Sequence, residues 1–261
     1  MKHYGKAMYQ LFNVYLQNTI VYNLVFKVLN YNFNNEDKTK QFLSILTECL
    51  SKNTSFDILR EFLKYNNLTF TSEKERVDSK VEDLISFFNF NNTNSVLDLG
   101  CGNGNVLTSL SKKLNINDCY GIDTVNYIED INFNYLQYNN NNQIPLNNES
   151  IDVATSLMVL HHTENPTHYI QELHRVLKKG GKLIIRETDA YNLDLLHFNL
   201  VMEFIFYEIL FNIPVQITRN YFSRNEWKSL FLNNGFKLIK EKSQNIKENP
   251  FTPFYFLMEK V

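Results

Sequence analysis

Three glycines stand at alternate positions in the segment "VLDLGCGNGNV", residues 96–106, directly after a short apolar run. The whole chain has only 8 glycines in 261 residues, so this spacing is a strong local signal. Glycine tolerates positive φ and lets a backbone approach a ligand closely. In open parallel sheets, ligands bind beyond the carboxyl ends of the strands. The segment therefore predicts a strand, a ligand-binding turn and a following helix.

The rest of the chain after residue 93 continues this pattern, because short apolar runs alternate with helical patterns. Helical spacing is found in "NVLTSLSKKL" and "THYIQELHRVLKK". The expected strands are "SVLDLG", "CYGID", "FNYLQY", "SIDVATSL", "GKLIIRE" and, near the end, "GFKLIK" and "FYFLMEK". Strands that alternate with helices indicate an α/β fold, with a parallel sheet covered by helices on both faces.

The first 90 residues have a different pattern of apolar residues, because their apolar side chains recur at the three- and four-residue spacing of helices. We expect residues 1–90 to form a helical N-terminal cap and residues 91–261 to form the core domain. A long aromatic helix at about residues 191–212 interrupts the alternation. It predicts a helical insertion in the core at about residues 190–220.

Composition narrows the class of protein. With 44% hydrophobic residues the chain can bury a core, and a net charge of -2 argues against avid nucleic-acid binding through charge alone. The 3 cysteines lack metal-ligand spacing, so we expect free thiols and no metal site. Polar residues interrupt every long apolar run, so neither a signal peptide nor a membrane span is expected. A cytoplasmic protein is the expectation.

The glycine spacing also bears on the ligand. A dinucleotide fingerprint places a third glycine three residues after Gly102, where this chain has Asn105. Asp98 stands two residues before Gly100 and would repel a pyrophosphate, but it suits an ammonium group. S-adenosylmethionine has an ammonium group, and its carboxylate suits backbone amides at a helix N-terminus. Asp123, at the end of the second strand, can accept the hydrogens of ribose hydroxyls.

A family resemblance rests on several of these motifs together. Over about residues 93–261 the chain resembles class I S-adenosylmethionine-dependent methyltransferases. Its sequence pattern is most similar to that of the ubiquinone/menaquinone-type branch. The motifs that carry it are "VLDLGCGNG", "GID", "IPLNNESIDVATSLMVLHH", "YIQELHRVLKKGGKLIIRE" and "YFSRNEWKSLFLNNGFKLI". The resemblance implies a Rossmann-like, doubly wound seven-stranded sheet, mostly parallel with an antiparallel last strand. It also implies that the helical segments outside the shared core cover an acceptor pocket.

Cofactor contacts are expected along the carboxyl ends of the strands. The resemblance implies that the position of Asn140, just before "IPL", contacts the adenine. Cys101 is expected to contribute its backbone and its packing rather than a reactive thiol. The full set expected to bind S-adenosylmethionine, or its product S-adenosylhomocysteine, is Asp98, Gly100, Cys101, Gly102, Asn103, Gly104, Asp123, Asn140 and Ser156.

Candidate catalytic groups follow the fourth and fifth strands. Either His161 or His162 could serve as a general base, since the ordinary pKa of histidine suits that task; alternatively they orient the strand-to-helix turn. Glu187, with Asp189 and Tyr191 after it, could hold or deprotonate an acceptor. The alternative is that the neighbouring arginine, within "IIRETD", forms an ion pair with one of these acids.

The sequence indicates less about the identity of the methyl acceptor than about the cofactor. The fourth strand lacks the Asn/Asp-Pro-Pro-aromatic pattern that would resemble amino-group methylation of bases or glutamine. Methyl transfer by direct displacement to a small, partly apolar acceptor is the first hypothesis, and an RNA or cap acceptor is the alternative. A third hypothesis is a methyltransferase-like protein that binds the cofactor and a partner without turnover.

Overall fold

The chain forms two compact units in the computed structural model. The structure describes residues 6–70, 73–124, 132–138, 143–212, 220–243, 251 and 253–261. One of the two units, which we call the helical unit, comprises Met1–Thr71, Thr188–Ile217 and Asn245–Thr252. We call the second the sheet unit; it comprises Ser72–Glu187, Thr218–Gln244 and Pro253–Val261.

A seven-stranded sheet in the order β3-β2-β1-β4-β5-β7-β6 organises the sheet unit. The pairs β1–β2, β1–β4, β2–β3 and β4–β5 are parallel, and β6 pairs with β7 in antiparallel fashion. The predicted fold class is therefore confirmed. The strands are β1 (Ser95–Leu99), β2 (Asp118–Asp123), β3 (Asn134–Gln137), β4 (Ile151–Leu157), β5 (Leu177–Thr188), β6 (Phe236–Ser243) and β7 (Pro253–Lys260).

The strand register aligns the carboxyl ends of the central strands. Leu99, the last residue of β1, pairs with Ile122 on β2 and with Ser156 on β4. Ser156 in turn pairs with Ile185 near the end of β5. The order of the strands along the chain reverses between β1 and β4, which is where open α/β sheets bind their ligands. The loops after β1, β2, β4 and β5 therefore meet at one edge of the sheet.

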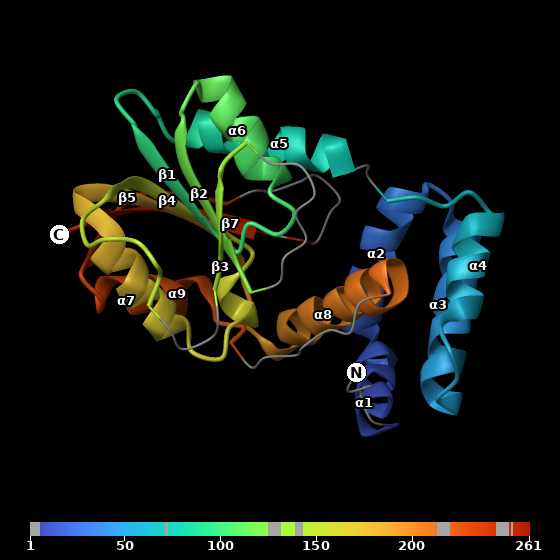
Figure 1. Ribbon diagram of the computed structural model, residues 1–261. Helices are drawn as coiled ribbons and strands as arrows, with labels where there is room; N and C mark the ends of the chain where they lie inside the picture. The colour runs from blue at the N-terminus through green and yellow to red at the C-terminus, as the bar shows by residue number, and fades with distance from the viewer. Residues whose placement is uncertain are drawn as a thin grey trace. The chain divides into compact units, whose positions relative to one another are not determined.

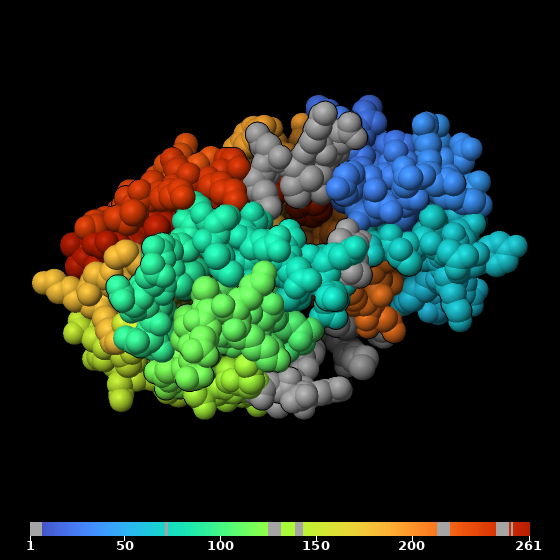
Figure 2. Space-filling model, turned by 90° about the horizontal axis from the view of Figure 1, so that it is seen from above, coloured from blue at the N-terminus to red at the C-terminus, as the bar shows by residue number. Residues whose placement is uncertain are grey.

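Helices cover both faces of this sheet. Figure 1 shows α5 (Glu73–Phe87) and α6 (Asn105–Leu114) on one side, and α7 (Pro166–Val176) and α9 (Arg224–Leu232) on the other. Side chains of α5 and α6 share a buried cluster with Val96 of β1, and those of α7 and α9 share one with Leu97. Because side chains alternate along a strand, successive residues of β1 serve the two cores. In the view of Figure 2, α5 and α6 (teal to green) cover the sheet.

The boundary of the N-terminal helical region differs from the expected one at residue 90. Helix α5 belongs to the sheet unit, so the change between units falls near residue 72. The reason is burial. Val81, Leu84 and Phe87 of α5 belong to the same buried cluster as Tyr255 of β7. Helical periodicity shows that a helix has an apolar face, but it does not show which core receives that face.

The N-terminal helices of the helical unit are separated by asparagines that act as caps. The side chains of Asn18 and Asn35 accept hydrogen bonds from the first backbone N–H groups of α2 and α3. Asn34 and Asn53 end the same two helices in the left-handed conformation, which asparagine tolerates better than most residues. The helices concerned are α1 (Lys6–Gln17), α2 (Thr19–Phe33), α3 (Glu36–Lys52) and α4 (Asp57–Tyr65).

Two segments far apart in the sequence pack together in the helical unit. The rings of Phe12 and Phe204 stack with centroids 4.5 Å apart, and those of Tyr15 and His197 stack at 3.9 Å. The aromatic segment at residues 191–212 thus packs against the first helix, while the role of these segments as an acceptor cover stays a prediction. The expected long helix is α8 (Leu193–Phe204) followed by the π-helical η2 (Ile205–Phe211). Among the described helices, none combines the length and the apolar character that crossing a membrane requires.

Candidate functional site

The glycine-rich loop after β1 has the backbone conformation that its sequence predicts. Gly100, Gly102 and Gly104 have φ angles of 72°, 56° and 76°, a region that other residues rarely occupy. A Cβ atom on Gly100 would lie 2.3 Å from the side chain of Val159. A Cβ atom on Gly102 would meet nothing within 4 Å. Gly100 is thus packed against the protein, whereas the backbone at Gly102 is open to a ligand.

Asp123 meets this loop at the end of β2. Its Oδ2 atom accepts a hydrogen bond of 2.8 Å from the backbone N–H of Gly102. Its Oδ1 atom accepts one of 2.7 Å from the N–H of Thr124. The carboxylate is half-buried, and each oxygen can accept further hydrogen bonds. Two motifs 21 residues apart are therefore in direct contact, as the sequence predicts for a shared ligand site.

Asp98 is the buried acid of the site, with only 4% of its surface exposed. Its Oδ1 atom accepts a hydrogen bond of 2.6 Å from the hydroxyl of Thr155 on β4. Burial raises the pKa of Asp98 to about 6, while the Thr155 hydroxyl and the nearby Lys80 ammonium act in the opposite direction. A carboxylate that is partly desolvated in this way would gain from a cationic ligand group.

Glu73 braces the loop from the start of α5, a contact that the sequence analysis missed. Its Oε1 atom accepts hydrogen bonds from the side-chain amides of Asn103 and, at 2.9 Å, Asn105. These two hydrogen bonds lower the pKa of Glu73. The side chain of Asn103, expected to bind cofactor, thus bonds to α5. No local pattern could have revealed the contact, because Glu73 lies 30 residues earlier, in a segment expected to belong to another domain.

Cys101 lies inside the loop with its thiol buried. Burial, together with the negative charges of Asp98 and Asp123, raises the pKa of the thiol. The thiolate, which is the nucleophilic form, is therefore disfavoured. The buried thiol therefore favours packing over reaction, and the contribution of Cys101 to cofactor binding stays a prediction.

Ser156 and Asn140 complete the set of residues expected to bind the cofactor. Ser156 is fully buried on β4, and its hydroxyl has no hydrogen-bond partner within the described residues. It follows Thr155, which bonds to Asp98, so strand alternation directs the Ser156 side chain to the opposite face of the sheet. Any contact of Ser156 with a ligand on the Asp98 side would thus use its backbone. Asn140 lies outside the described residues.

The turn after β4 is a second special segment at the same edge of the sheet. Met158 has a φ of 66°, which is rare for a residue other than glycine or asparagine. Its backbone N–H donates a hydrogen bond of 2.7 Å to the carbonyl of Arg186 on β5. The short helix η1 (Leu160–His162) follows. Strained backbone of this kind occurs often at functional sites, where surrounding contacts hold it.

A buried carboxylate organises this turn. Oε2 of Glu187 lies 2.5 Å from Nδ1 of His161, and Oε1 accepts hydrogen bonds from the backbone N–H groups of Val159 and Leu160. Both side chains are almost fully buried, at 1% and 0% exposure. A carboxylate that accepts two amide hydrogens is an acceptor toward the imidazole too, which places the proton of a neutral ring on Nδ1. The ion pair considered for Arg186 is not formed by Glu187.

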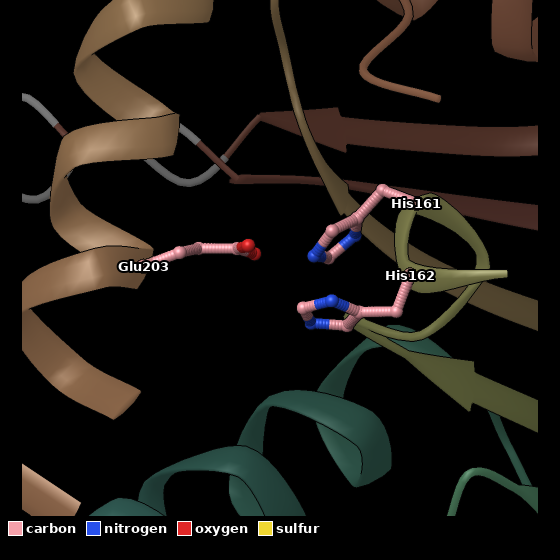
Figure 3. Close-up of side chains that lie close together, drawn as sticks. All are labelled: His161, His162 and Glu203. Carbon is pink, nitrogen blue, oxygen red and sulfur yellow. The ribbon is translucent and has the colours of Figure 1, made fainter. Parts of the chain in front are cut away.

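His162 and Tyr221 line the same turn around His161. Their rings lie with centroids 4.1 Å and 5.1 Å from the ring of His161. Figure 3, which also labels Glu203 on α8, shows the two imidazoles on this turn. The other two residues expected after the fifth strand, Asp189 and Tyr191, belong to the helical unit, whereas Glu187 belongs to the sheet unit.

Comparison with known proteins identifies the family of this fold and loop. A family model described as a methyltransferase domain matches residues 73–241, well over half of the chain. The chain belongs to the class I S-adenosylmethionine-dependent methyltransferase family. The match begins at α5, in agreement with the assignment of that helix to the sheet unit.

Individual relatives of this methyltransferase-family chain are distant. The demethylmenaquinone methyltransferase of Oceanobacillus iheyensis is 24% identical over 206 residues, which cover 70% of this chain and 86% of the relative. The mitochondrial ubiquinone biosynthesis O-methyltransferase of Dictyostelium discoideum is 28% identical over 131 residues, 43% of this chain and 40% of the relative. The chain spans less than half the length of the first two curated relatives that it matches.

Solved structures show the same fold. An S-adenosylmethionine-dependent methyltransferase from Mesorhizobium loti superimposes with a TM-score of 0.54 at 13% identity. The superposition covers 70% of this chain and 100% of the other. At this identity the comparison supports the fold alone.

Proposed function

We propose that the protein transfers the methyl group of S-adenosylmethionine to a small, partly apolar acceptor. The observation that carries this proposal is the meeting of Asp98, the open backbone at Gly102 and the Asp123 carboxylate where the strand order reverses. This donor and acceptor set matches a ligand with ribose hydroxyls and an amino-acid end. The family to which the chain belongs uses that cofactor.

Each part of the loop has a separate task in this proposal. Asp123 accepts hydrogen bonds from the ribose hydroxyls, for which an ionised carboxylate is a strong acceptor. At the N-terminus of α6 the cap residue Gly104 has no side chain, and the Asn103 side chain accepts from the N–H of Asn105, so the following backbone N–H groups are the ones offered to negative charge. Asp98 holds the ammonium group of the amino-acid end. When bound, the cofactor supplies a methyl group that its sulfonium already activates, so the protein mainly aligns the reactants and excludes water.

His161 is the proposed general base. Glu187 holds the proton of the neutral imidazole on Nδ1, so that Nε2 is the basic nitrogen of the ring and the atom that would take a proton from an acceptor. A base is needed only when the acceptor atom is protonated at neutral pH, as in a hydroxyl group. Glu187 is a positioning residue in this proposal, because it acts through His161.

Two features support a small acceptor. The two relatives described above are named for the methylation of quinone precursors, which are small and partly apolar molecules. The net charge of -2 offers no general attraction for nucleic acid. We propose that the aromatic helical unit selects the acceptor.

Binding and transfer can be tested separately. Calorimetry should show that S-adenosylhomocysteine binds with a dissociation constant on the order of micromolar, about -8 kcal/mol. Incubation with cofactor labelled on the methyl group and a fractionated extract should then place the label in small molecules. Label in RNA or protein would contradict the acceptor class. Binding without transfer to any fraction would favour a binding protein without turnover, and absence of binding would contradict the cofactor itself.

A further inference from the structure

Helix α7 holds the chain on both sides of the segment that is expected to contact the adenine. His168 and Glu172 stand four positions apart on α7, which puts them on one face of the helix. The hydroxyl of Tyr138 lies 3.1 Å from Nε2 of His168. The backbone N–H of Ile144 donates a hydrogen bond of 2.7 Å to Oε2 of Glu172. Residues 139–142, which lie outside the described part of the chain, come between these two anchors.

The anchor at Ile144 is made by side chains and not by pairing between strands. Nε and Nη2 of Arg175 donate hydrogen bonds of 2.9 Å and 2.7 Å to the two carboxylate oxygens of Glu172. Arg175 also donates to the carbonyls of Ile144 and Leu146, at 2.8 Å and 2.9 Å, and at 2.8 Å to the side-chain oxygen of Asn148. Both main-chain polar groups of Ile144 therefore bond to one charged pair on α7.

This pair is tightly held because its carboxylate is buried. Glu172 is only 7% exposed. Burial acts to raise the pKa of Glu172, but the hydrogen bonds from Arg175 and from the N–H of Ile144 outweigh it and lower the pKa. Glu172 is thus ionised at neutral pH, and hydrogen bonds to an ionised group are stronger than neutral ones. Removing one partner of such a buried pair leaves an uncompensated charge. The backbone of Ile144 is therefore fixed to α7.

The anchor at Tyr138 leads to the ribose side of the proposed site. The backbone N–H of Tyr138 donates a hydrogen bond of 2.8 Å to the carbonyl of Asp123, whose carboxylate is the proposed partner of the ribose hydroxyls. The ring of Tyr138 is buried, and its centroid lies 5.4 Å from that of Tyr169 on α7. Helix α7 thus supports the nucleoside part of the proposed site through Tyr138 as well as through Ile144.

We infer that the face of α7 formed by His168, Glu172 and Arg175 sets how well the protein distinguishes the base of the cofactor, by holding Tyr138 and Ile144. A site that hydrogen-bonds a polar group rejects an analogue without that group only if its own groups are held in place. Glu172 is a positioning residue in this inference, because it acts through the backbone of Ile144. The inference rests on the proposed function and extends it to a helix that the sequence did not connect with the cofactor.

Two ligands that differ only in the base provide the test. S-adenosylhomocysteine has the amino group of adenine, and S-inosylhomocysteine has an oxo group in its place. Calorimetry on the full chain should show that the wild type prefers S-adenosylhomocysteine. Glu172→Gln keeps the size of the side chain but removes the charge that binds Arg175 and Ile144. It should narrow the preference about 10-fold, the effect of losing a hydrogen bond to a charged group.

Tyr138→Phe tests the other anchor with a smaller change, since it removes the hydroxyl that meets His168 and keeps the buried ring. A neutral hydrogen bond is weaker, so the preference should narrow about 3-fold. Gln171→Ala is the control on the same helix. It removes a hydrogen bond from an exposed α7 side chain to Asn234 and should leave the preference unchanged. Urea unfolding of each variant measures its structural cost separately.

The possible outcomes separate this inference from the function on which it rests. If Glu172→Gln and Tyr138→Phe lowered stability, or both affinities equally, without changing the preference, α7 would be a structural support alone and the inference would be overturned. Equal binding of the two ligands by the wild type would also overturn it, because the base would then not be distinguished. In both cases the proposed function would stand. Failure of the wild type to bind S-adenosylhomocysteine would overturn the proposed function itself.

Discussion

The loop after β1 and the turn after β4 lie at the same edge of the sheet, yet they are built by different means. The loop depends on main-chain conformation, because its glycines have positive φ and its N–H groups donate hydrogen bonds to the Ile122 carbonyl and the Asp123 carboxylate. The turn depends on side chains, because Glu187 holds both its backbone and His161. The two segments touch where Gly100 faces Val159.

The contrast indicates that ligand recognition and reactivity depend on different segments of the sheet unit. A backbone loop tolerates little change in shape, and its main-chain groups do not titrate. A buried imidazole and carboxylate can move a proton, but they depend on a contact between residues 26 positions apart. Substitutions in the loop should therefore change ligand affinity and stability, and substitutions in the turn should change turnover.

Replacing Glu187 with Gln should separate the turn from the loop most clearly. The amide oxygen of Gln can still accept the N–H groups of Val159 and Leu160, but its NH₂ group would face Nδ1 of His161 and move the ring proton to Nε2. Removing a general base typically lowers turnover, and we expect kcat to fall about 100- to 1,000-fold. Steady-state kinetics should show this loss in kcat, while calorimetry should show unchanged affinity for S-adenosylhomocysteine.

Glu82→Gln is the control for this experiment, because Glu82 is exposed and its ion pair within the described residues, with Lys113, is long at 3.7 Å. It should have full turnover. If Glu187→Gln weakened cofactor affinity as much as turnover, the turn would be a structural part of the cofactor site.

A pair of glycine substitutions should show that Gly100, and not Gly102, packs against the turn. Gly100→Ala and Gly102→Ala both place a side chain at positive φ, which costs about 1–2 kcal/mol. Only Gly100→Ala also forces a Cβ atom against Val159, so overpacking should add about 1–3 kcal/mol. Urea unfolding should therefore show a larger loss for Gly100→Ala. Equal losses would mean that Val159 moves away at no cost.

Asp123→Ala should weaken cofactor binding while the fold stays intact. A charge-assisted hydrogen bond to a ribose hydroxyl is worth about 1.5–3 kcal/mol, so the dissociation constant should rise by the corresponding factor. Titration with S-adenosylhomocysteine measures this change, and circular dichroism checks the fold. Thr124→Val, which keeps the backbone donor to Asp123, is the matched control. An unchanged dissociation constant in Asp123→Ala would remove the carboxylate from the site.

The buried acid of the loop should leave a pH signature in stability. Burial raises the pKa of Asp98 to about 6, so the folded state binds an extra proton between its ordinary pKa and that value. The free energy of unfolding should thus fall as the pH rises from about 4 to about 6, by at most about 1.4 kcal/mol per pH unit from this group. Urea unfolding of wild type and Asp98→Asn across this range should show a flatter dependence in the variant. Parallel curves would contradict the raised pKa.

Local sequence patterns were sufficient to predict the α/β architecture and the cofactor part of the candidate site. Alternating apolar runs and helical patterns are local properties, and parallel strands bring their carboxyl ends to one edge without further information. For that reason Asp98, the three glycines and Asp123 could be placed together before any contact was known. The asparagine caps of α2 and α3 also follow a local rule, although in an asparagine-rich chain the rule could not single them out.

Contacts between residues that are distant in the sequence could not be predicted from local patterns and became known from the folded structure. Helical periodicity placed Glu73 and Lys80 on one face of a helix, but it could not show that this face meets the glycine loop and Asp98. The same reason explains the shift of the unit boundary from residue 90 to residue 72. His161 and Glu187 were both candidates in the sequence, yet their pairing depends on two strand ends meeting in a buried place. Hydrogen bonds and burial depend on which residues are neighbours in space, and the order of residues along the chain does not specify these neighbours.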